Sequence, residues 1–363
     1  MGGAERIAAS IATSGNADID YHVVEVVRGR SAYTRTFLQE LRSAGVKCHR
    51  AVVPDVRFHF IFERVAALTF PLWFIFLYIK HRPIAIHSHT EVPDMATFAL
   101  VKLFPFIKKR CRIVRTIHNT RLWTGQKKMG RHIERFFIRN KSNVAISTAV
   151  RDSYAKIYGQ ETPIIYNGVP ESQSVNGNTD VPKVEKTENE ISILFAGRFE
   201  EQKGIATLVK IIKEEAHAGS RYMFHLYGDG SLREFIESQL KDCRNVVLNA
   251  PMHGLRRLMP QFDYLLMPSE FEGLSTLSIE ASMEGLPVIA NRCPGLTETL
   301  PPDWPLAVDN NDIGEYKHLF RNVIPSVPRK EIKASALRYA TARFSLSTMR
   351  QSYEAIYMSP IGK

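Results

Sequence analysis

The chain has 363 residues, of which 44% are hydrophobic and 23% are charged, and its formal net charge is +11. The length favours two domains, and the composition is that of a soluble globular protein. The four cysteines are scattered and form no CxxC pair, which argues against a disulfide scaffold or a zinc site and fits a reducing cytosol.

Apolar segments typical of buried strands alternate with helical patterns along the chain, which predicts a doubly wound α/β protein. In the first half, the predicted strands are residues 21–27, 46–53, 84–89, 112–118, 143–147 and 163–166. Helices are predicted between them, for example at 33–44 and 131–139.

A glycine-rich segment, Gly2-Gly3-Ala4-Glu5-Arg6, precedes the apolar residues of a first helix and predicts a loop whose amides face an anionic group. A Rossmann-type domain places a central strand directly before such a loop. No such strand precedes this segment, so we expect a first domain that lacks its first strand and has two exposed sheet edges.

Residues 65–79 form an apolar run that contains Pro71 and is bounded by Arg64 and Lys80. Fifteen residues are short for a membrane span, which needs about 20, so we expect a buried or interface-facing helix. The stretch from Lys102 to Lys141 follows with thirteen Lys or Arg residues and a single acid, Glu134. This basic stretch indicates contact with an anionic membrane surface or an acidic substrate, and no nucleic-acid motif accompanies it.

Residues 171–190 are polar and poor in large apolar side chains, which predicts an interdomain linker. The alternation then restarts, with strands predicted at 192–196, 223–227, 246–248, 264–267 and 287–290. Helices are predicted at 205–216, 232–240, 278–283 and 329–343, and a last helix at 345–357.

The first strand of the second half runs into Gly197-Arg198, and Lys203 follows where the next helix begins. Two cations at a strand exit, opposite a helix N-terminus, can neutralise a diphosphate. Gly228-Asp229-Gly230 is a similar glycine turn after the next strand, short of a full GxGxxG motif. An exposed basic loop remains the alternative interpretation of the two cations.

The segment 268–281 is the most informative one in the chain. A predicted strand ends before Glu272-Gly273, and Leu274 and Ser275 lead into a helix that carries Glu280. A helix N-terminus at the carboxyl edge of a parallel sheet suits a phosphate, and carboxylates accept hydrogen bonds from sugar hydroxyls. An ordinary helix start with surface acids is the alternative.

Histidines end two strands of the first half: His87 and His89 end one, and His118, before Asn119, ends the next. A histidine at a carboxyl edge can bond a sugar or move a proton, although a lone histidine is more often structural. Asp18-Ile19-Asp20 formally matches a metal-binding DxD pattern but lies in a polar turn, so we expect a surface turn, no metal and no cofactor.

Together these residues resemble the retaining glycosyltransferases of family 4. The resemblance covers nearly the whole chain and is most specific at Gly197-Arg198 with Lys203-Gly204, at Gly228-Asp229-Gly230, and at Glu272-Gly273 leading to Glu280. It implies the GT-B fold, with two Rossmann-like doubly wound domains facing across a cleft. The expected division is an acceptor-side domain at 1–170, the linker at 171–190, a nucleotide-sugar domain at 191–344 and a C-terminal helix at 345–363 that packs back on the first domain.

The resemblance also implies residue roles. Arg198 and Lys203 would hold the nucleotide diphosphate beside Gly197, Gly228 and Gly230, with backbone amides of Leu274 and Ser275 after Gly273. Glu280 would bind the ribose, and Glu272 the hydroxyls of the transferred sugar. Gly2 and Gly3 would approach the phosphates or the acceptor, and His118 would lie beside the reacting sugar.

The expected function is therefore retaining transfer of a hexose from a nucleotide diphosphate sugar, with UDP-sugars favoured, to a glycan or lipid-linked acceptor. Cell-surface polysaccharide biosynthesis is the expected setting, in the cytoplasm and peripherally on the inner face of the cell membrane. The alternatives are a nucleotide-sugar epimerase of the same fold, or a catalytically silent glycan- or membrane-binding relative.

Overall fold

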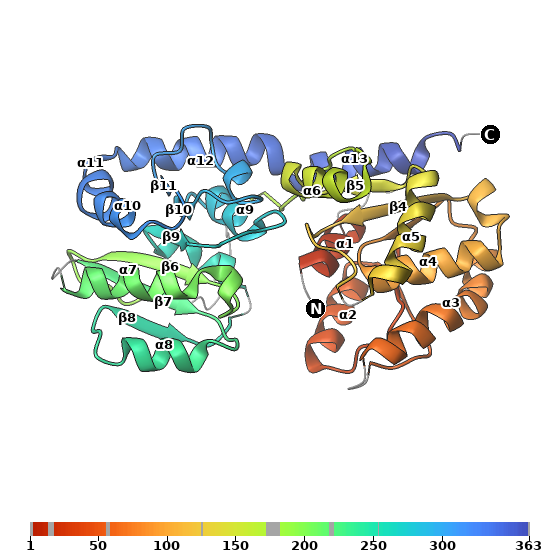
Figure 1. Ribbon diagram of the computed structural model, residues 1–363, viewed down its shortest axis with the longest axis horizontal. Coiled ribbons are helices and arrows are strands. Elements are labelled where there is room, and N and C mark those ends of the chain that lie inside the picture. The colour runs from red at the N-terminus through yellow and green to blue at the C-terminus, as the bar shows by residue number, and fades with distance from the viewer. Residues whose placement is uncertain are drawn as a thin grey trace. The chain divides into compact units, whose positions relative to one another are not determined.

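The computed structural model describes residues 3–13, 18–55, 59–124, 126–171, 182–217, 221–252 and 254–361. The chain divides into two compact units (Figure 1). Unit 1 comprises Met1–Gly168 and Leu346–Lys363, and unit 2 comprises Val169–Ser345. The predicted linker falls mostly outside the described residues, which resume at Pro182.

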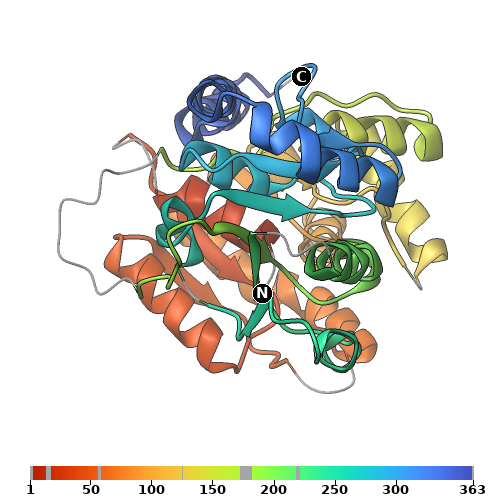
Figure 2. The same cartoon turned by 90° about the vertical axis from the view of Figure 1, so that its left-hand side faces the viewer.

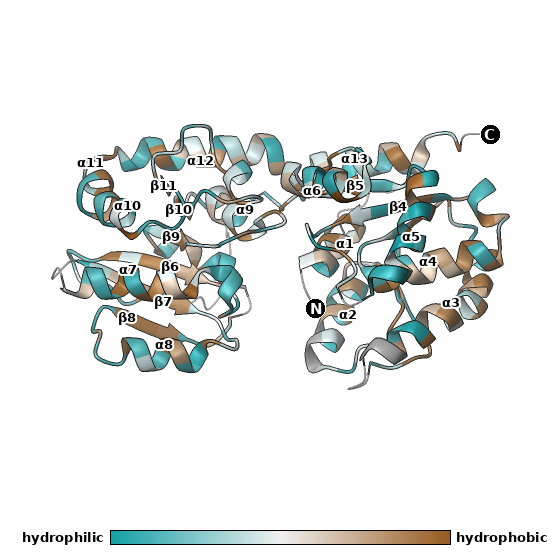
Figure 3. Ribbon diagram, in the orientation of Figure 1, coloured by the Kyte–Doolittle hydropathy of each residue, from teal (hydrophilic) through white to brown (hydrophobic). Residues whose placement is uncertain are grey.

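Unit 2 contains one six-stranded parallel sheet with the order β11-β10-β9-β6-β7-β8. Its strands are β6 (Ile191–Ala196), β7 (Tyr222–Tyr227), β8 (Val246–Asn249), β9 (Tyr264–Met267), β10 (Val288–Asn291) and β11 (Ala307–Val308). The first five agree with the predicted strands to within one or two residues at each end. Burial on both faces explains the nearly continuous apolar sequences of the central strands, whereas β8, at the sheet edge, is only partly buried. Figure 3 shows β6, β7 and β8 largely in brown.

Helices flank the strands of unit 2, and the turned view in Figure 2 shows helical ribbons above and below the teal strands. The helices are α7 (Ile205–His217), α8 (Arg233–Leu240), α9 (Thr276–Met283), α10 (Ile313–His318), α11 (Ile324–Ser326) and α12 (Arg329–Phe344). A π-helical turn lies at Leu319–Val323, and 3-10 turns lie at Glu201–Lys203, Leu255–Arg257, Met259–Gln261 and Thr297–Thr299. α7 packs on α8, and α12 packs on α9. One contiguous hydrophobic cluster joins these helices to the sheet.

Unit 1 has two separate parallel sheets among its described residues. One pairs β1 (His22–Glu25) with β2 (Lys47–Arg50), and the other has the order β3 (Ala85–Ser88), β4 (Arg112–Ile117), β5 (Asn143–Ala145). The strand predicted at 163–166 was wrong, because only an isolated bridge joins Ile164 to Ala145. Cavities of about 460 and 280 Å³ are lined by residues of both β1 and β3.

The helices of unit 1 are α1 (Gly3–Thr13), α2 (Ala32–Ser43), α3 (His59–His81), α4 (Glu91–Leu103), α5 (Lys127–Arg139), α6 (Thr148–Tyr158) and α13 (Leu346–Met358), with a 3-10 turn at Ile107–Lys109. α13 contacts α1, and Tyr357 and Tyr353 bond His87 and Thr116 of the three-stranded sheet. The last helix therefore packs within unit 1.

α3 is longer than the predicted apolar run. Its segment Phe62–His81 is the one described helical stretch with the length and composition to cross a membrane, and a third of that window is buried. Buried Phe70, Phe74 and Tyr78 pack it onto unit 1, while Leu72 and Phe76 are exposed. One side of α3 therefore packs against the core of unit 1, and the other side is apolar and exposed.

A buried ion network occupies the centre of unit 1. Arg115 Nη1 and Nη2 each donate to a carboxylate oxygen of Glu134 at 2.8 Å, and Arg115 Nε donates to Asp94 Oδ2 at 2.7 Å. Trp123 Nε1 and the Tyr154 hydroxyl donate to the same Glu134 carboxylate, at 2.6 and 2.5 Å. Two charged residues of the predicted basic stretch, Arg115 and Glu134, are therefore buried and contribute nothing to a surface charge.

Candidate active site

The site-bearing loops of unit 2 lie where its strand order reverses. From β6 the chain proceeds outward to β7 and β8, and it then returns to β9 on the other side of β6. In a doubly wound sheet, such a switch point leaves a crevice at the carboxyl ends of the two strands, where ligands bind. We call residues 197–204 after β6 and 268–275 after β9 the switch-point loops. Arg198, Lys203 and Glu272 all belong to them.

The first switch-point loop carries the two cations. Arg198 is exposed, and its Nη2 donates to Gln202 Oε1 at 3.3 Å. Gly204 ends the 3-10 turn Glu201–Lys203 with a left-handed backbone, φ +66°, and an added Cβ would lie 1.8 Å from the Pro268 carbonyl oxygen. The two switch-point loops therefore approach each other so closely that only glycine fits at this position.

Lys203 and Glu272 form an ion pair across the two loops. Lys203 Nζ lies 2.6 Å from Glu272 Oε1, and these side chains are only 18% and 9% exposed. The Ser269 hydroxyl donates to the same Glu272 oxygen at 2.9 Å. This structure holds Lys203 at the switch point with a carboxylate as its counter-ion.

The turn after β9 leads into α9, and Ser275 caps this helix by accepting a hydrogen bond from Ser278 N. The Ser275 N–H donates to the Gly295 carbonyl oxygen at 2.9 Å, so this amide already has a partner. No described residue accepts a hydrogen bond from the Leu274 N–H. Of the two amides that the resemblance implied, Leu274 is the one open to an anion. Gly295, with φ +75°, allows the close approach at this turn.

The remaining predicted residues of unit 2 lie on neighbouring segments. Glu280 is half-buried on α9, about one turn after the first helical residue, Thr276. Gly197 and Phe199 N–H groups donate to Tyr227 and Asp229 carbonyl oxygens, which ties the first switch-point loop to the Gly228–Gly230 turn after β7. Gly273 lies between Glu272 and Leu274 in the second switch-point loop.

Two residues that sequence reasoning missed support these loops: Gln202 joins them to each other, and Ser269 bonds within the second loop and to β10. Gln202 donates through Nε2 to Phe271 O at 3.0 Å and accepts at its backbone oxygen from Glu270 N at 2.9 Å. Ser269 is buried and, besides bonding Glu272, accepts at its backbone oxygen from Asn291 Nδ2. The only signal in the sequence was that Gln202 directly precedes Lys203 and that Ser269 lies three residues before Glu272.

Unit 2 also has a cavity of about 730 Å³ at the opposite edge of the sheet, lined by residues such as Glu190, Arg221 and Tyr222 at the amino ends of β6 and β7. The described residues of its lining include no glycine, and parallel sheets bind ligands at their carboxyl edges. The switch-point loops, not this cavity, are therefore the candidate nucleotide site.

In unit 1, His118 follows β4 and meets His89, which follows β3. His89 Nδ1 lies 3.2 Å from His118 Nε2, and both line a cavity of about 390 Å³ with Glu91 and Asn119. Burial lowers the pKa of His89 to about 4 and holds the pKa of His118 well below its ordinary value. Both rings are therefore neutral at pH 7 and can share a single proton along their contact. His87 bonds Tyr357 and Thr116 at 2.7 Å and is structural.

The glycine loop expected at the N-terminus is different in the structure. Gly3 is the first residue of α1, so it belongs to the helix, while Gly2 lies outside the described residues. The role of Gly2 in donor binding therefore stays a prediction. At the DxD pattern, Asp18 is exposed in a turn, and Asp20 binds Lys47 and His22 at 2.5 and 3.2 Å.

Family models match both parts of the chain. Residues 190–323 match the model described as glycosyl transferases group 1, and residues 1–173 match the model of glycosyltransferase family 4. An uncharacterized 41.2 kDa protein in the cps region of Klebsiella pneumoniae is 28% identical over 292 residues, covering 76% of this chain and 78% of that protein.

Solved structures share the fold over the full length. Anabaena HepE in complex with UDP and glucose superposes with a TM-score of 0.75 at 17% identity, covering 99% of this chain and 96% of that chain. The lipopolysaccharide outer core galactosyltransferase WaaB superposes with a TM-score of 0.68 at 17% identity, covering 98% and 95%. The predicted GT-B fold class is confirmed. The protein is a glycosyltransferase, and it belongs to the group 1 and family 4 glycosyltransferases.

Proposed function

We propose that this glycosyltransferase moves a hexose, with retained anomeric configuration, from a UDP-sugar to a glycan or lipid-linked acceptor in cell-surface polysaccharide biosynthesis. The observation that carries the proposal is the Lys203–Glu272 pair at the switch point, beside the exposed Arg198. Support for the donor and the setting comes from the proteins of this fold, one of which holds UDP and glucose and one of which is a lipopolysaccharide galactosyltransferase.

The diphosphate would lie over the first switch-point loop, against Arg198, Lys203 and the Leu274 amide. Charge builds on the leaving diphosphate as the glycosidic bond breaks, and fixed cations stabilise this charge more in the transition state than in the ground state. When the diphosphate takes Lys203 as its partner, Glu272 is free to accept hydrogen bonds from the hydroxyls of the transferred sugar. Glu280 would bind the ribose hydroxyls.

Retention in a single step requires attack on the face from which the diphosphate departs, whereas a double displacement would pass through a covalent intermediate. Glu272 is held by Lys203 and Ser269 and is a sugar-binding group in this scheme, so we propose no covalent intermediate on it. A departing phosphate oxygen would take the acceptor proton, and the reaction needs no resident metal in this scheme. His118, kept neutral by burial, would donate to or accept from a hydroxyl of the reacting sugar.

The open face of α3 supports contact with a membrane surface. Leu68, Leu72, Phe76 and Ile79 are 60–72% exposed and recur every three or four residues, so they form one apolar stripe. Exposed cations lie near the ends of α3 and on the 3-10 turn that follows α4: Arg64, Lys80, Arg82, Lys108, Lys109 and Arg110. An apolar stripe with flanking cations fits the headgroup region of an anionic bilayer.

Vesicle co-sedimentation tests this contact. The wild type should sediment with anionic vesicles more than with neutral ones, and Phe76→Ser with Leu72→Ser should reduce sedimentation. Leu337→Ser provides a matched control, because Leu337 is an exposed leucine on α12. Equal sedimentation of the wild type and the double variant would contradict a membrane role for α3.

Turnover of Lys203→Ala tests the proposed function. Losing one cation that stabilises the leaving group should lower kcat by about 10²–10³-fold. Lys210→Ala, an exposed lysine on α7, should retain wild-type turnover. Near wild-type turnover of Lys203→Ala would refute the assigned role, and conversion of the donor without an acceptor would identify an epimerase instead.

A further inference from the structure

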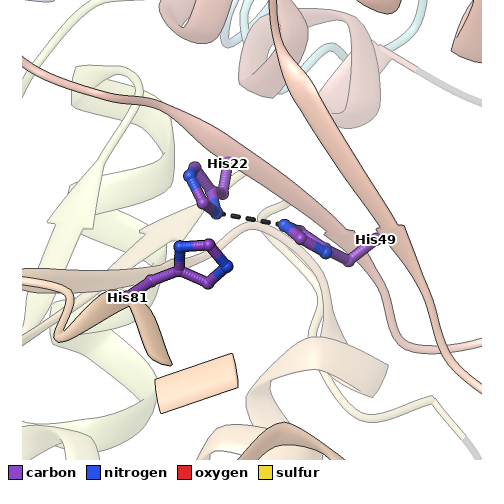
Figure 4. Close-up of side chains that lie close together, drawn as sticks. All are labelled: His22, His49 and His81. Atoms are coloured by element: carbon purple, nitrogen blue, oxygen red, sulfur yellow. Dashed lines mark hydrogen bonds between the residues drawn. The ribbon is translucent and has the colours of Figure 1, made fainter. Parts of the chain in front are cut away.

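Three histidines outside the candidate active site converge in unit 1. His22 begins β1, His49 lies in β2, and His81 ends α3. Figure 4 shows the three rings facing one another from these separate elements. One ring nitrogen of each lies within 4.8 Å of the others.

Local structure explains the convergence. β1 and β2 are parallel, and Val24 pairs with His49 in their register. Side chains alternate along a strand, so His22, two residues before Val24, lies on the same face as His49. α3 ends at His81, and Arg82 then turns the chain towards β3 with φ +46°. This sharp helix end places the third ring beside the first two.

The contacts between the ring nitrogens are compatible with a metal-binding site. His22 Nδ1 lies 3.0 Å from His49 Nε2, and Asp20 Oδ2 lies 3.2 Å from His22 Nε2. When a carboxylate accepts a hydrogen bond from one ring nitrogen, the other ring nitrogen carries the lone pair that can bind a metal. This arrangement is found behind metal-binding histidines. His81 Nε2 is buried and has no hydrogen-bond partner among the described residues. A buried nitrogen without a partner requires an explanation, and an ion is one.

Two of the three rings, His49 and His81, have lowered pKa values. Burial, then the charges of His22 and His81, lowers the pKa of His49, and burial lowers that of His81. The charges of Lys80 and Lys47 also lower the pKa of His49, and Lys47 is paired with Asp20. Neutral imidazole is the form that binds metals. The rings also line the cavity of about 280 Å³ beside β1 and β3, which leaves room next to them.

We propose that His22, His49 and His81 bind a zinc ion, with solvent as the fourth ligand. Tetrahedral zinc with Zn–N distances of about 2.0–2.1 Å places its ligand nitrogens about 3.3 Å apart. His22 and His49 already have a similar spacing, 3.0 Å, and a ring nitrogen of His81 lies within 4.8 Å of theirs. The ion links the end of α3 to the two-stranded sheet.

This proposal reverses the expectation of no metal. The three ligands are separated by 27 and 32 positions and come from three elements, so no short sequence motif predicts them. The role of the ion is structural and independent of the transfer reaction, because none of the three histidines belongs to the switch-point loops or to the His89–His118 pair.

Titration calorimetry with ZnCl₂ tests the site on the full chain after treatment with EDTA, at pH 7.5. The wild type should bind one zinc ion at this site, and His49→Ala and His81→Ala should each weaken binding at least tenfold. Asp20→Asn should weaken it about tenfold, because it removes the group that orients His22. His132→Ala, an exposed histidine on α5, is the matched control and should bind zinc as the wild type does.

Thermal unfolding gives a second readout. Zinc should raise the Tm of the wild type and of His132→Ala, and leave the Tm of His49→Ala unchanged, while MgCl₂ should shift none of them, since magnesium prefers oxygen ligands. His81→Gln, at the last residue of α3, serves if an alanine variant fails to fold. Absence of zinc binding by the wild type, or equal binding by the wild type and the His49 and His81 variants, would overturn the proposal.

Discussion

Unit 2 holds its strands in one six-stranded sheet over one contiguous apolar core, whereas unit 1 divides its strands between two sheets and its buried apolar residues among separate clusters. Unit 1 places a polar network in its centre, in which Arg115 joins Asp94 on α4 to Glu134 on α5. The apolar core of unit 2 fixes the switch-point loops through the ends of two neighbouring strands. The difference indicates that unit 2 is stabilised mainly by burial and unit 1 also by specific buried contacts.

Of the substitutions considered, Arg115→Leu should have the largest effect on stability, and it tests whether unit 1 depends on its buried ion network. It leaves the carboxylates of Asp94 and Glu134 buried without their cation, which should lower the free energy of unfolding of unit 1 by about 3–5 kcal/mol. Urea unfolding followed by the fluorescence of Trp123, which bonds Glu134, measures the change.

Arg151→Leu is the control for this substitution, because Arg151 and Asp152 form an exposed pair. Its stability should stay close to that of the wild type. Similar stability of the Arg115 and Arg151 variants would show that the buried network does not support unit 1.

Gly204→Ala should destabilise unit 2 by about 3 kcal/mol, because it adds both a left-handed alanine and a clash with the Pro268 carbonyl. Gly285→Ala is matched, since Gly285 has φ +69° with nothing within 4 Å of the added Cβ, and it should cost about 1 kcal/mol. Urea unfolding followed by the fluorescence of Trp304 in unit 2 compares the two. Equal losses would mean that the switch-point loops are not held in close contact.

Acidification should weaken unit 1 through His89. Its pKa in the folded protein is about 4, below the ordinary 6.5, so its contribution is fully present above pH 6.5 and is lost as the pH falls towards 4. The loss between pH 7 and pH 5 should be about 2 kcal/mol.

His89→Gln isolates this contribution, because the opposing effect of Asp94, whose pKa burial raises to about 6, is common to both proteins. Urea unfolding at pH 7 and pH 5 should show a smaller loss for His89→Gln than for the wild type. An equal or larger loss in the variant would contradict a buried neutral His89.

The same comparison explains how much the sequence could predict. The strands of unit 2 are mostly apolar, and glycine-containing loops follow β6, β7 and β9, so the limits of these strands and the positions of Arg198, Lys203 and Glu272 followed from residue pattern. β11, only two residues long, was missed because so short a segment has no periodicity. Gln202 bonds Phe271, 69 positions away, and no local pattern predicts such a contact. Ser269 bonds Glu272 within the same loop, and a serine three residues before a carboxylate is too common a pattern to reveal this role.

Unit 1 was less predictable because its important contacts join distant segments. Arg115 lies in a basic stretch that is typical of a solvated surface. In the structure it is buried on β4, where it pairs with a carboxylate from α4 and one from α5. His89 and His118 were expected at the ends of their strands, but their contact was not predicted; it follows from the pairing of β3 with β4. Gly3 was expected in a loop, but it starts α1, because the first helix extends to its N-terminal glycine.

Titration of UDP and of uridine, side by side, tests most directly whether the switch-point loops bind a diphosphate. Arg198→Ala and Lys203→Ala should each weaken UDP binding at least tenfold, about 1.4 kcal/mol, and leave uridine binding unchanged, with Lys210→Ala matching the wild type for both. Unchanged UDP affinity in the Arg198 and Lys203 variants, or an equal loss for uridine, would contradict a diphosphate site at these loops.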